Sequence, residues 1–341
     1  MQALVFTKAE KSLELKEVPK PKISKSTDVL VKISNCGVCG TDCHIFHGDI
    51  SNVGDVFVPG HEAGGVVTAV GDDVTAVKVG DKVAIDPNKG CHGCNHCRNA
   101  NPHFCKKGSF NDAFGIFRNG GFAEHAVVPE ESLYLVPENF NMSHMSLVEP
   151  LSCVVHGWRK LTAGRQIQTG AKILVQGAGI IGSLWCCLMH FKGYRHVTVS
   201  EPSEERRGFI DGLQLGFKTT EPKGIEQDYD VVVDCSGAVR AIQDGINRVA
   251  HGGIFLQFGV APSTATCEIR PFHIYEREIT IQGVMVNPWA FPEAIELTNQ
   301  LRARYLDFAK LGIGKYKLDE YKECFDKLSS GKISKASFVF E

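Results

Sequence analysis

The sequence lacks an apolar run long enough to cross a bilayer, so we expect no transmembrane span. It also lacks an excess of either charge, because 37 basic and 39 acidic residues leave a formal net charge of −2. That balance gives no reason to expect a nucleic acid or an anionic membrane surface as a partner. Residues 1–6 resemble a short strand and lack the basic and apolar regions of a signal peptide, and we therefore expect a cytoplasmic protein.

Cysteine, in contrast, is abundant, with 13 residues in a chain of 341. Chains held together by disulfides are usually small and exported, and neither description fits here. One tight cluster has the spacing C-x2-C-x2-C-x7-C and consists of Cys91, Cys94, Cys97 and Cys105. Four thiolates at this spacing can close the tetrahedral shell of a structural zinc ion, whereas iron–sulfur runs space their fourth cysteine differently. Because four thiolates saturate the metal, we expect the interleaved histidines to be exposed loop residues: His92, His96 and His103.

A second group of metal-ligand types occurs in the stretch Gly60-His61-Glu62 and in a cysteine-containing segment upstream of it. The upstream candidates are Cys36, Cys39 and Cys43, and spacing alone does not choose among them. A thiolate, an imidazole and a carboxylate form a ligand set that zinc prefers. Three protein ligands leave the fourth tetrahedral position open for water or substrate, as in a catalytic zinc site.

The first third of the chain has the pattern of short β-strands. Apolar and polar residues alternate in residues 1–35, and the runs at 66–71 and 77–84 continue this pattern with Gly-Asp turns. The strand pattern returns at residues 120–137. Short strands joined by such turns predict a partly open β-barrel.

The pattern changes at residue 171, where a continuous apolar strand leads into Gly177-Ala178-Gly179-Ile180-Ile181-Gly182. This G-x-G-x-x-G motif between a strand and a helix is typical of dinucleotide binding, since backbone N–H groups at the helix start meet the phosphates. The next strand ends at Glu201, roughly 20 residues after the motif, and a carboxylate there binds ribose hydroxyls and repels a 2′-phosphate. NAD is therefore favoured, although Arg206 and Arg207 leave NADP open.

Further strands alternate with helix-length segments, at residues 230–234, 252–259 and 279–283, which predicts a doubly wound sheet. Two helix-like stretches follow at 291–310 and 319–330, and residues 336–340 have the pattern of a strand. A chain of 341 residues is too long for one ordinary core, so we expect two domains.

With Cys39, Gly60-His61-Glu62, the four-cysteine cluster and the nucleotide motif in this order, the chain resembles the zinc-dependent medium-chain alcohol dehydrogenases. Within that family it is most similar to the polyol branch of sorbitol, xylitol and arabinitol dehydrogenases. The zinc stretch G-H-E-x-x-G-x5-G-x2-V is matched from Gly60 to Val74. The resemblance implies an α/β protein whose parts are a GroES-like partly open β-barrel catalytic domain at 1–152 with a structural zinc lobe at 88–108, a doubly wound Rossmann NAD(P)-binding domain at 153–286, and a C-terminal return to the catalytic domain at 287–341.

The resemblance also implies roles for individual residues. The catalytic zinc ligands would be Cys39, His61 and Glu62, and Glu149 would lie beside the zinc as an orienting or exchanging group. Asp42 would be the partner of His61, and Thr41 with His44 would form a proton relay. The four clustered cysteines would hold the structural zinc. The cofactor-binding positions would be Gly177, Gly179, Ile181, Gly182, Glu201, Arg206, Phe258 and Gly259.

We therefore expect a zinc-dependent oxidoreductase that transfers a hydride from a secondary alcohol of a polyol or sugar-acid-like substrate to NAD(P)⁺. The family suggests a homo-oligomer, a dimer or tetramer joined through residues 279–286. Residues 284–287 lack the arginine that animal sorbitol dehydrogenase uses for polyol hydroxyls, and that enzyme lacks the cysteine cluster, which puts sorbitol itself in doubt. The alternatives are a threonine-type or simple secondary alcohol dehydrogenase and, from another class, a non-catalytic nucleotide-binding zinc protein. The complete ligand and relay set argues against the non-catalytic role and against a zinc-free quinone reductase.

Overall fold

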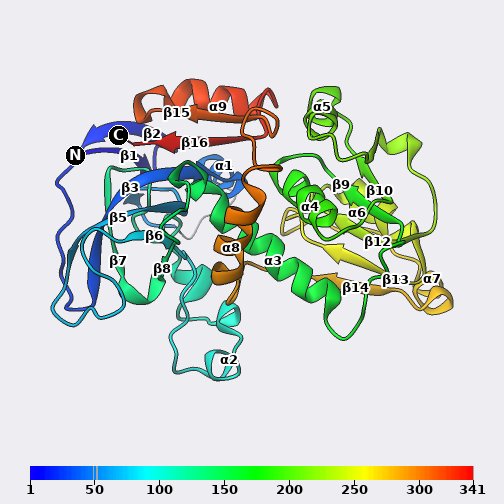
Figure 1. Ribbon diagram of the computed structural model, residues 1–341, viewed down its shortest axis with the longest axis horizontal. Helices are drawn as coiled ribbons and strands as arrows, with labels where there is room; N and C mark the ends of the chain where they lie inside the picture. Colours follow the sequence, from blue (N-terminus) through cyan, green and yellow to red (C-terminus); the bar gives the residue numbers. More distant parts are fainter. Residues whose placement is uncertain (49, 51–52, 341) are drawn as a thin grey trace. The chain divides into compact units, whose positions relative to one another are not determined.

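The computed structural model describes residues 1–48, 50 and 53–340 and divides into two compact units (Figure 1). The first unit comprises Met1–Ser152, Val286–Gln300 and Ile313–Glu341, and the second comprises Cys153–Met285 and Leu301–Gly312. The α/β class is confirmed. The division into compact units assigns no role to either one, so the catalytic role of the first and the nucleotide-binding role of the second are predictions.

The first unit is built on two sheets. One has the strand order β15-β16-β3-β5-β6-β8, with β7 also paired to β3, and the other has the order β2-β1-β4. The strands are β1 (Gln2–Thr7), β2 (Ser12–Glu17), β3 (Asp28–Val38), β4 (Val56–Phe57), β5 (Glu62–Val70), β6 (Lys82–Ile85), β7 (His125–Pro129), β8 (Leu133–Leu135), β15 (Ile313–Tyr316) and β16 (Lys335–Val339). The helices are α1 (Gly40–His47), α2 (Asn95–Arg98), α8 (Phe291–Leu301) and α9 (Tyr321–Ser329).

Strand β3 is the centre of this unit, and nearly all of its residues are buried. It pairs antiparallel with β5, β7 and β16, so strands from both ends of the chain lie side by side (Figure 1). The register places Gly37 opposite Glu62 and Val38 opposite Ala336. The end of β3, the start of β5 and the start of β16 therefore meet at one place, and the metal-ligand candidates lie there.

The second unit contains a parallel sheet in the order β11-β10-β9-β12-β13-β14. Its strands are β9 (Ile173–Gln176), β10 (Val197–Ser200), β11 (Lys218–Thr220), β12 (Tyr229–Asp234), β13 (Val249–Gln257) and β14 (Thr280–Gly283). Its helices are α4 (Ile180–Phe191), α5 (Glu204–Gly212), α6 (Val239–Asn247) and α7 (Pro271–Arg277); α3 (Val148–Thr162) begins in the first unit and continues into this one. The strand order runs outward in both directions from β9 and β12, which confirms the doubly wound sheet and puts its switch point between these two strands.

Two sequence expectations are wrong in their extent. The strand expected at 77–84 begins only at Lys82, because Lys78 and Asp81 form a turn in which the Asp81 carboxylate accepts the Lys78 N–H at 2.9 Å. The helix expected at 291–310 ends at Leu301, and further on the Asp307 side chain accepts the N–H of Lys310 in a turn. In the sequence the apolar spacing extends beyond the observed start of the strand and the observed end of the helix. In the structure these residues form turns, which side-chain hydrogen bonds to the backbone stabilise.

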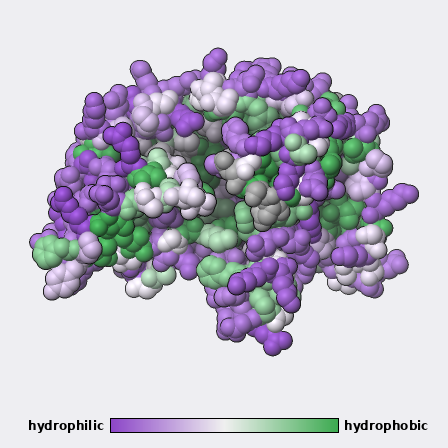
Figure 2. All heavy atoms as spheres, turned by 180° about the vertical axis from the view of Figure 1, so that it is seen from behind, coloured by the Kyte–Doolittle hydropathy of each residue, from purple (hydrophilic) through white to green (hydrophobic). Residues whose placement is uncertain are grey.

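Hydrophilic side chains cover most of the face shown in Figure 2, with hydrophobic ones in patches among them. Within the part of the chain that the structure describes, no helix has the length and apolar character needed to cross a membrane.

Candidate active site

Three of the predicted metal ligands lie together in the first unit. The ligand atoms of Cys39, His61 and Glu62 are all within 4.8 Å of one another. Zinc–ligand bonds of about 2.0–2.3 Å put two ligands of one ion roughly 3–4 Å apart, so this spacing fits a single zinc ion. His61 and Glu62 are buried and Cys39 is partly exposed, which leaves one side from which a substrate could approach.

The structure also chooses among the three upstream thiols. Cys36 lies in β3 and is fully buried, and burial raises its pKa well above the usual range of a thiol. Burial likewise raises the pKa of Cys43, on α1, to about 11. Only Cys39 belongs to a group of potential metal ligands with His61, among the residues described. The grouping of potential ligand atoms therefore favours Cys39 over the other two thiols.

Local backbone structure places these ligands. Cys39 caps the N-terminus of α1, and its N–H donates to the Asp42 carboxylate at 2.8 Å. Its thiol donates to the Thr41 hydroxyl at 3.5 Å. Gly60 has φ = +96°, and a Cβ there would overlap the ring of Phe122. Only glycine fits this position, and the turn it makes leads directly into His61 and the start of β5.

Asp42, the implied partner of His61, is fully buried, and its Oδ1 lies 3.9 Å from His61 Nδ1. That distance is an ion-pair separation, longer than a hydrogen bond. Burial raises the pKa of Asp42 to about 6, although the charge of His61 opposes the shift. The two residues are therefore neighbours as expected, while the role of Asp42 in fixing the tautomer of His61 stays a prediction.

Sequence reasoning missed Lys335, which is buried and forms an ion pair with Glu62. Its ammonium also donates to the carbonyl of Val38 at 3.1 Å. Burial lowers the pKa of Lys335, but the charges of Glu62 and Cys39 outweigh it and raise the pKa above its ordinary value. No motif surrounds this lysine, and only the pairing of β16 with β3 brings it to the site. A carboxylate has about four acceptor positions, so Glu62 retains capacity for a metal ion.

Glu149 is buried near the start of α3 but lies outside the three-ligand group among the described residues. Its negative charge still acts on the site, since it contributes to the raised pKa of both His61 and Lys335. Asn287, another residue that sequence reasoning missed as a site residue, contacts this carboxylate. His44 is exposed on α1, and Thr41 lies between Cys39 and His44 in the sequence.

The four-cysteine cluster forms the second candidate metal site. Its sulfur atoms lie within 4.8 Å of one another, and the sulfurs of Cys94 and Cys97 are 3.5 Å apart. Zinc–sulfur bonds of about 2.3 Å would separate tetrahedral sulfurs by roughly 3.8 Å, so the cluster fits zinc. The prediction that His92 and His96 are exposed is confirmed, but for His103 it is wrong. His103 is buried and its ring packs against Phe104 at 3.9 Å between centroids.

The predicted cofactor residues gather at the carboxyl edge of the parallel sheet in the second unit. Gly177 has φ = +98°, and a Cβ on Gly182 would overlap the carbonyl of Gly177, so both glycines are required by the turn between β9 and α4. Gly179 caps α4, and Ile181 lies in its first turn. Phe258 and Gly259 follow β13, and their N–H groups donate to the carbonyl of Asp234 at 3.1 and 2.7 Å.

Glu201 is held in place at that edge before any ligand binds. Its carboxylate accepts the N–H of Ala178 in the glycine turn at 2.9 Å and that of Ser203 at 3.0 Å. Arg207 donates to backbone carbonyls of residues 201 and 202 and is therefore structural. Arg206 Nε, in contrast, is buried without a hydrogen-bond partner among the described residues.

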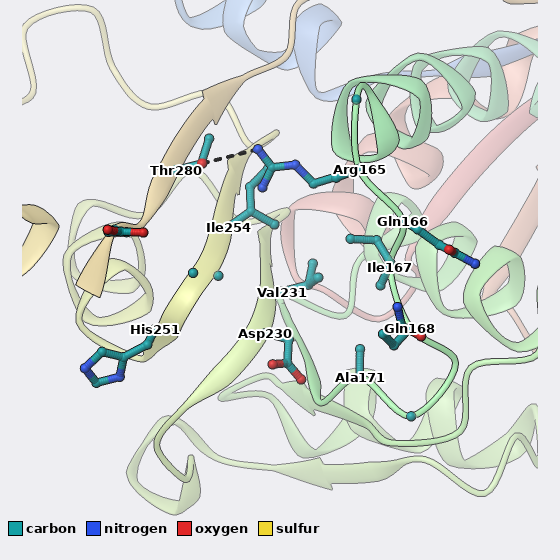
Figure 3. Close-up of a pocket in the computed structure, with 15 residues that line it drawn as sticks. Arg165, Gln166, Ile167, Gln168, Ala171, Asp230, Val231, His251, Ile254 and Thr280 are labelled. Carbon is teal, nitrogen blue, oxygen red and sulfur yellow. Dashed lines mark hydrogen bonds between the residues drawn. The ribbon is translucent and has the colours of Figure 1, made fainter. Parts of the chain in front are cut away.

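A separate hollow of about 610 Å³ lies at the amino ends of β12, β13 and β14 (Figure 3). Arg165 lines it and donates to the Thr280 hydroxyl at 3.3 Å. Its other ionisable side chains, Asp230, His251 and Glu278, are exposed. The glycine motif lies at the opposite edge of the same sheet, so this hollow is not the predicted nucleotide site.

Comparison with known proteins agrees with this geometry. The family model described as the alcohol dehydrogenase GroES-like domain matches residues 25–138, and the one described as the glucose dehydrogenase C-terminus matches residues 142–336. D-arabinitol dehydrogenase 1 of Uromyces fabae is 32% identical over 325 residues, which cover 89% of this chain and 87% of that one. L-threonine 3-dehydrogenase of Yersinia pestis (strain Pestoides F) is 27% identical over 351 residues, which cover 98% of each chain.

Among solved structures, the NADP-bound crystal structure of a protein from Sinorhizobium meliloti 1021, titled a zinc-binding dehydrogenase, superposes with a TM-score of 0.88. It is 26% identical and covers 99% of each chain. The chain belongs to the zinc-dependent medium-chain alcohol dehydrogenase family. The predictions of this family, of a GroES-like domain with a Rossmann-type sheet and of a dehydrogenase enzyme are therefore confirmed. The predicted zinc and nicotinamide cofactors agree with these relatives and with the cysteine cluster.

Replacing Lys335 with methionine should destabilise the first unit. Removing one partner of a buried ion pair leaves the other charge buried alone, at a cost of about 3–5 kcal/mol. The measurement is the free energy of unfolding of the metal-free protein in urea. Lys332→Met, at an exposed position in the same segment, is the matched control and should change that energy by no more than about 0.5 kcal/mol. Equal effects of the two substitutions would show that the Lys335–Glu62 pair is not important for stability.

Proposed function

We propose that the protein oxidises a secondary alcohol of a polyol or sugar-acid-like substrate to a ketone and transfers the hydride to NAD(P)⁺. The proposal depends most on one observation, the clustering of the Cys39, His61 and Glu62 ligand atoms within 4.8 Å. Three protein ligands of these types leave a fourth zinc position open for a substrate oxygen. The similarity to a relative named D-arabinitol dehydrogenase supports a polyol as the substrate class.

In this proposal, the residues that bind the metal and activate the substrate hydroxyl belong to the first unit. Zinc bound by Cys39, His61 and Glu62 would supply Lewis acidity that makes a hydroxyl lose its proton near neutral pH. Thr41, whose hydroxyl contacts the Cys39 sulfur, would accept that proton, and the exposed His44 would pass it to solvent. Glu149 would place its carboxylate beside the metal and orient a water or exchange as a ligand. Each turnover thus releases one hydride to the cofactor and one proton to solvent.

The second unit would bind the nucleotide. The glycine turn leaves N–H groups at the start of α4 for the pyrophosphate, and Phe258 and Gly259 would line the nicotinamide. Glu201 uses two acceptor positions on backbone N–H groups, which leaves two of about four for ribose hydroxyls. We therefore infer a preference for NAD⁺, with Arg206 as the residue that would meet a 2′-phosphate.

A threonine-type substrate is the second candidate. It is favoured by the 27% identity to L-threonine 3-dehydrogenase over 98% of both chains. Residues 284–287 carry no cation that would bind polyol hydroxyls, so this segment does not favour the polyol over threonine. A substrate panel separates the two.

The decisive experiment follows NADH formation by absorbance with alditols, sugar acids, threonine and simple secondary alcohols, each offered with NAD⁺ and NADP⁺. We expect turnover with an alditol or sugar acid that is lost on chelation and restored by zinc. Cys39→Ser should abolish turnover and leave NADH binding unchanged, since it removes a zinc ligand from the first unit only. Cys43→Ser is the matched control and should remain active. Normal turnover by Cys39→Ser would refute the zinc role, and reaction with threonine alone would replace the substrate class.

The cofactor preference can be tested at Glu201. Glu201→Gln keeps an acceptor for the Ala178 N–H but removes the negative charge that repels a 2′-phosphate. The ratio of kcat/KM for NAD⁺ to that for NADP⁺ should fall about tenfold, which corresponds to roughly 1.4 kcal/mol. Glu204→Ala, at an exposed residue of α5, should leave the ratio unchanged. An unchanged ratio in Glu201→Gln would remove Glu201 from the ribose site.

We also propose that the protein is a homo-oligomer joined through β14. This strand lies at one edge of the parallel sheet. The side chains of Ile281, within the strand, and of Met285, just after it, are 42% and 43% exposed. An edge strand offers unpaired backbone groups to a second copy. Light scattering should show a dimer or tetramer, which Ile281→Lys weakens and which Val79→Lys, at an exposed valine of the first unit, does not. A monomeric wild-type protein would contradict the proposal.

A further inference from the structure

Asn287 is a polar residue without any exposed surface. It follows β14 and precedes α8, in the segment Val286–Gln300 that belongs to the first unit. A buried amide without partners costs several kcal/mol relative to its hydration in water, so such residues are retained where their hydrogen bonds are made. The partners of this amide therefore indicate what the residue does.

Each end of the Asn287 amide has a partner. Its Nδ2 donates to the Ser152 hydroxyl at 2.8 Å and lies 3.5 Å from Glu149 Oε1. The Ser152 hydroxyl in turn donates to the backbone carbonyl of Glu149 at 2.6 Å. A carboxylate only accepts hydrogen bonds, so the NH₂ group must face Glu149. The amide thus contacts Glu149 directly at its side chain and through Ser152 at its backbone.

The opposite end of the amide leads to the cysteine lobe. Asn287 Oδ1 accepts a hydrogen bond from Asn88 Nδ2 at 3.0 Å, and Asn88 lies three residues before Cys91. The N–H of Asn88 is itself fixed by the buried carboxylate of Asp86 at 2.9 Å. Two residues after Asn287, Trp289 Nε1 donates to the carbonyl of Ala100 within the lobe at 3.0 Å. The short segment 287–289 is therefore attached to the cysteine lobe at two points and to Glu149 at one end.

We propose that Asn287 is a positioning residue that fixes the Glu149 carboxylate at the catalytic metal site and couples its position to the cysteine lobe. This inference rests on the proposed function, which places Glu149 beside that metal. It is supported by the two contacts of Asn287 with Glu149, one at the carboxylate and one through Ser152 at the backbone carbonyl. A structural metal in the lobe would then keep Asn88 and Asn287 in register with Glu149.

Asparagine suits this position for a physical reason. The site requires a donor toward Glu149 and an acceptor toward Asn88 on one short side chain. Aspartate would place an acceptor against a carboxylate, and leucine of similar volume would leave the polar atoms of Ser152 and Asn88 without their partner. Glutamine adds a methylene to a fully buried site and would overpack it.

The test compares Asn287→Asp and Asn287→Leu with Thr298→Val. Thr298 is equally buried in the same segment and donates to the Ala294 carbonyl at 2.7 Å, so its valine variant loses a comparable hydrogen bond that involves neither Glu149 nor the cysteine lobe. Steady-state kinetics are measured on the zinc-loaded enzyme with the best substrate of the panel. The d–d absorption bands of Co²⁺ exchanged into the catalytic site and the melting temperature are also recorded. The Co²⁺ bands report the metal geometry without any turnover.

Both Asn287 variants should lower kcat about 10- to 100-fold, as loss of a partner that orients a metal-site group does, and should leave the KM for NAD⁺ unchanged. Both should also shift the Co²⁺ bands. Thr298→Val should lower the melting temperature by a similar amount without changing kcat or the bands. Asn88→Ala, at a partly exposed position, should reproduce the direction of the kcat change more weakly and decides the matter if the Asn287 variants do not fold.

The outcomes separate the two proposals. If the Asn287 variants lose stability as Thr298→Val does but keep the wild-type kcat and Co²⁺ bands, the positioning role is wrong and the proposed function stands. If the wild-type protein oxidises none of the alcohols but the Asn287 variants still shift the Co²⁺ bands, the positioning role stands and the proposed function fails. If Asn88→Ala folds and keeps the wild-type kcat and Co²⁺ bands, the coupling of Glu149 to the cysteine lobe is refuted.

Discussion

The first unit depends on the burial of several acidic groups at one point. The thiol of Cys39 and the carboxyl groups of Asp42 and Glu62 lie there together with the basic groups of His61 and Lys335. Like charges so close are costly in a protein interior unless they are paired and hydrogen bonded. The Lys335 ammonium compensates one of them, and a divalent cation held by Cys39, His61 and Glu62 would compensate more. The same arrangement that makes the metal-free site costly would therefore favour the binding of a cation.

Strand register is what brings these charges together. Glu62 opposes Gly37, and Ala336 opposes Val38, so Lys335 and Glu62 flank the same end of β3. A shift of one residue in either pairing would turn Lys335 or Glu62 to the other face of the sheet. The C-terminal strand therefore contributes to the energetics of the candidate metal site through Lys335, although it supplies no predicted ligand. This explains why the first unit must include residues from both ends of the chain.

Sequence could predict the parts of the site whose residues are near each other in the chain. The G-x-G-x-x-G turn, Glu201 and the four-cysteine lobe follow from short-range spacing, because backbone geometry over a few residues fixes where they lie. The thiol could not be chosen among Cys36, Cys39 and Cys43, since the choice depends on which sulfur lies beside His61 in the folded chain. Lys335 and Asn287 carry no motif and reach the site only through tertiary packing, whereas Ser152 contacts the Glu149 carbonyl within α3. His103 was misjudged because the number of ligands a metal needs says nothing about which neighbouring rings the lobe buries.

The residues that sequence missed share one physical property, which is that each holds a carboxylate or its backbone. Lys335 binds Glu62, while Asn287 and Ser152 hold Glu149. The second unit uses backbone N–H groups for the same purpose, on Glu201 and on Asp234. A buried carboxylate that lacks donors shifts its pKa or moves, so the donors determine where each negative charge lies and how strongly it acts. The motifs thus supply the reacting and binding groups, and residues distant in sequence set their geometry. For this reason family membership defines the chemistry here more sharply than it defines the substrate.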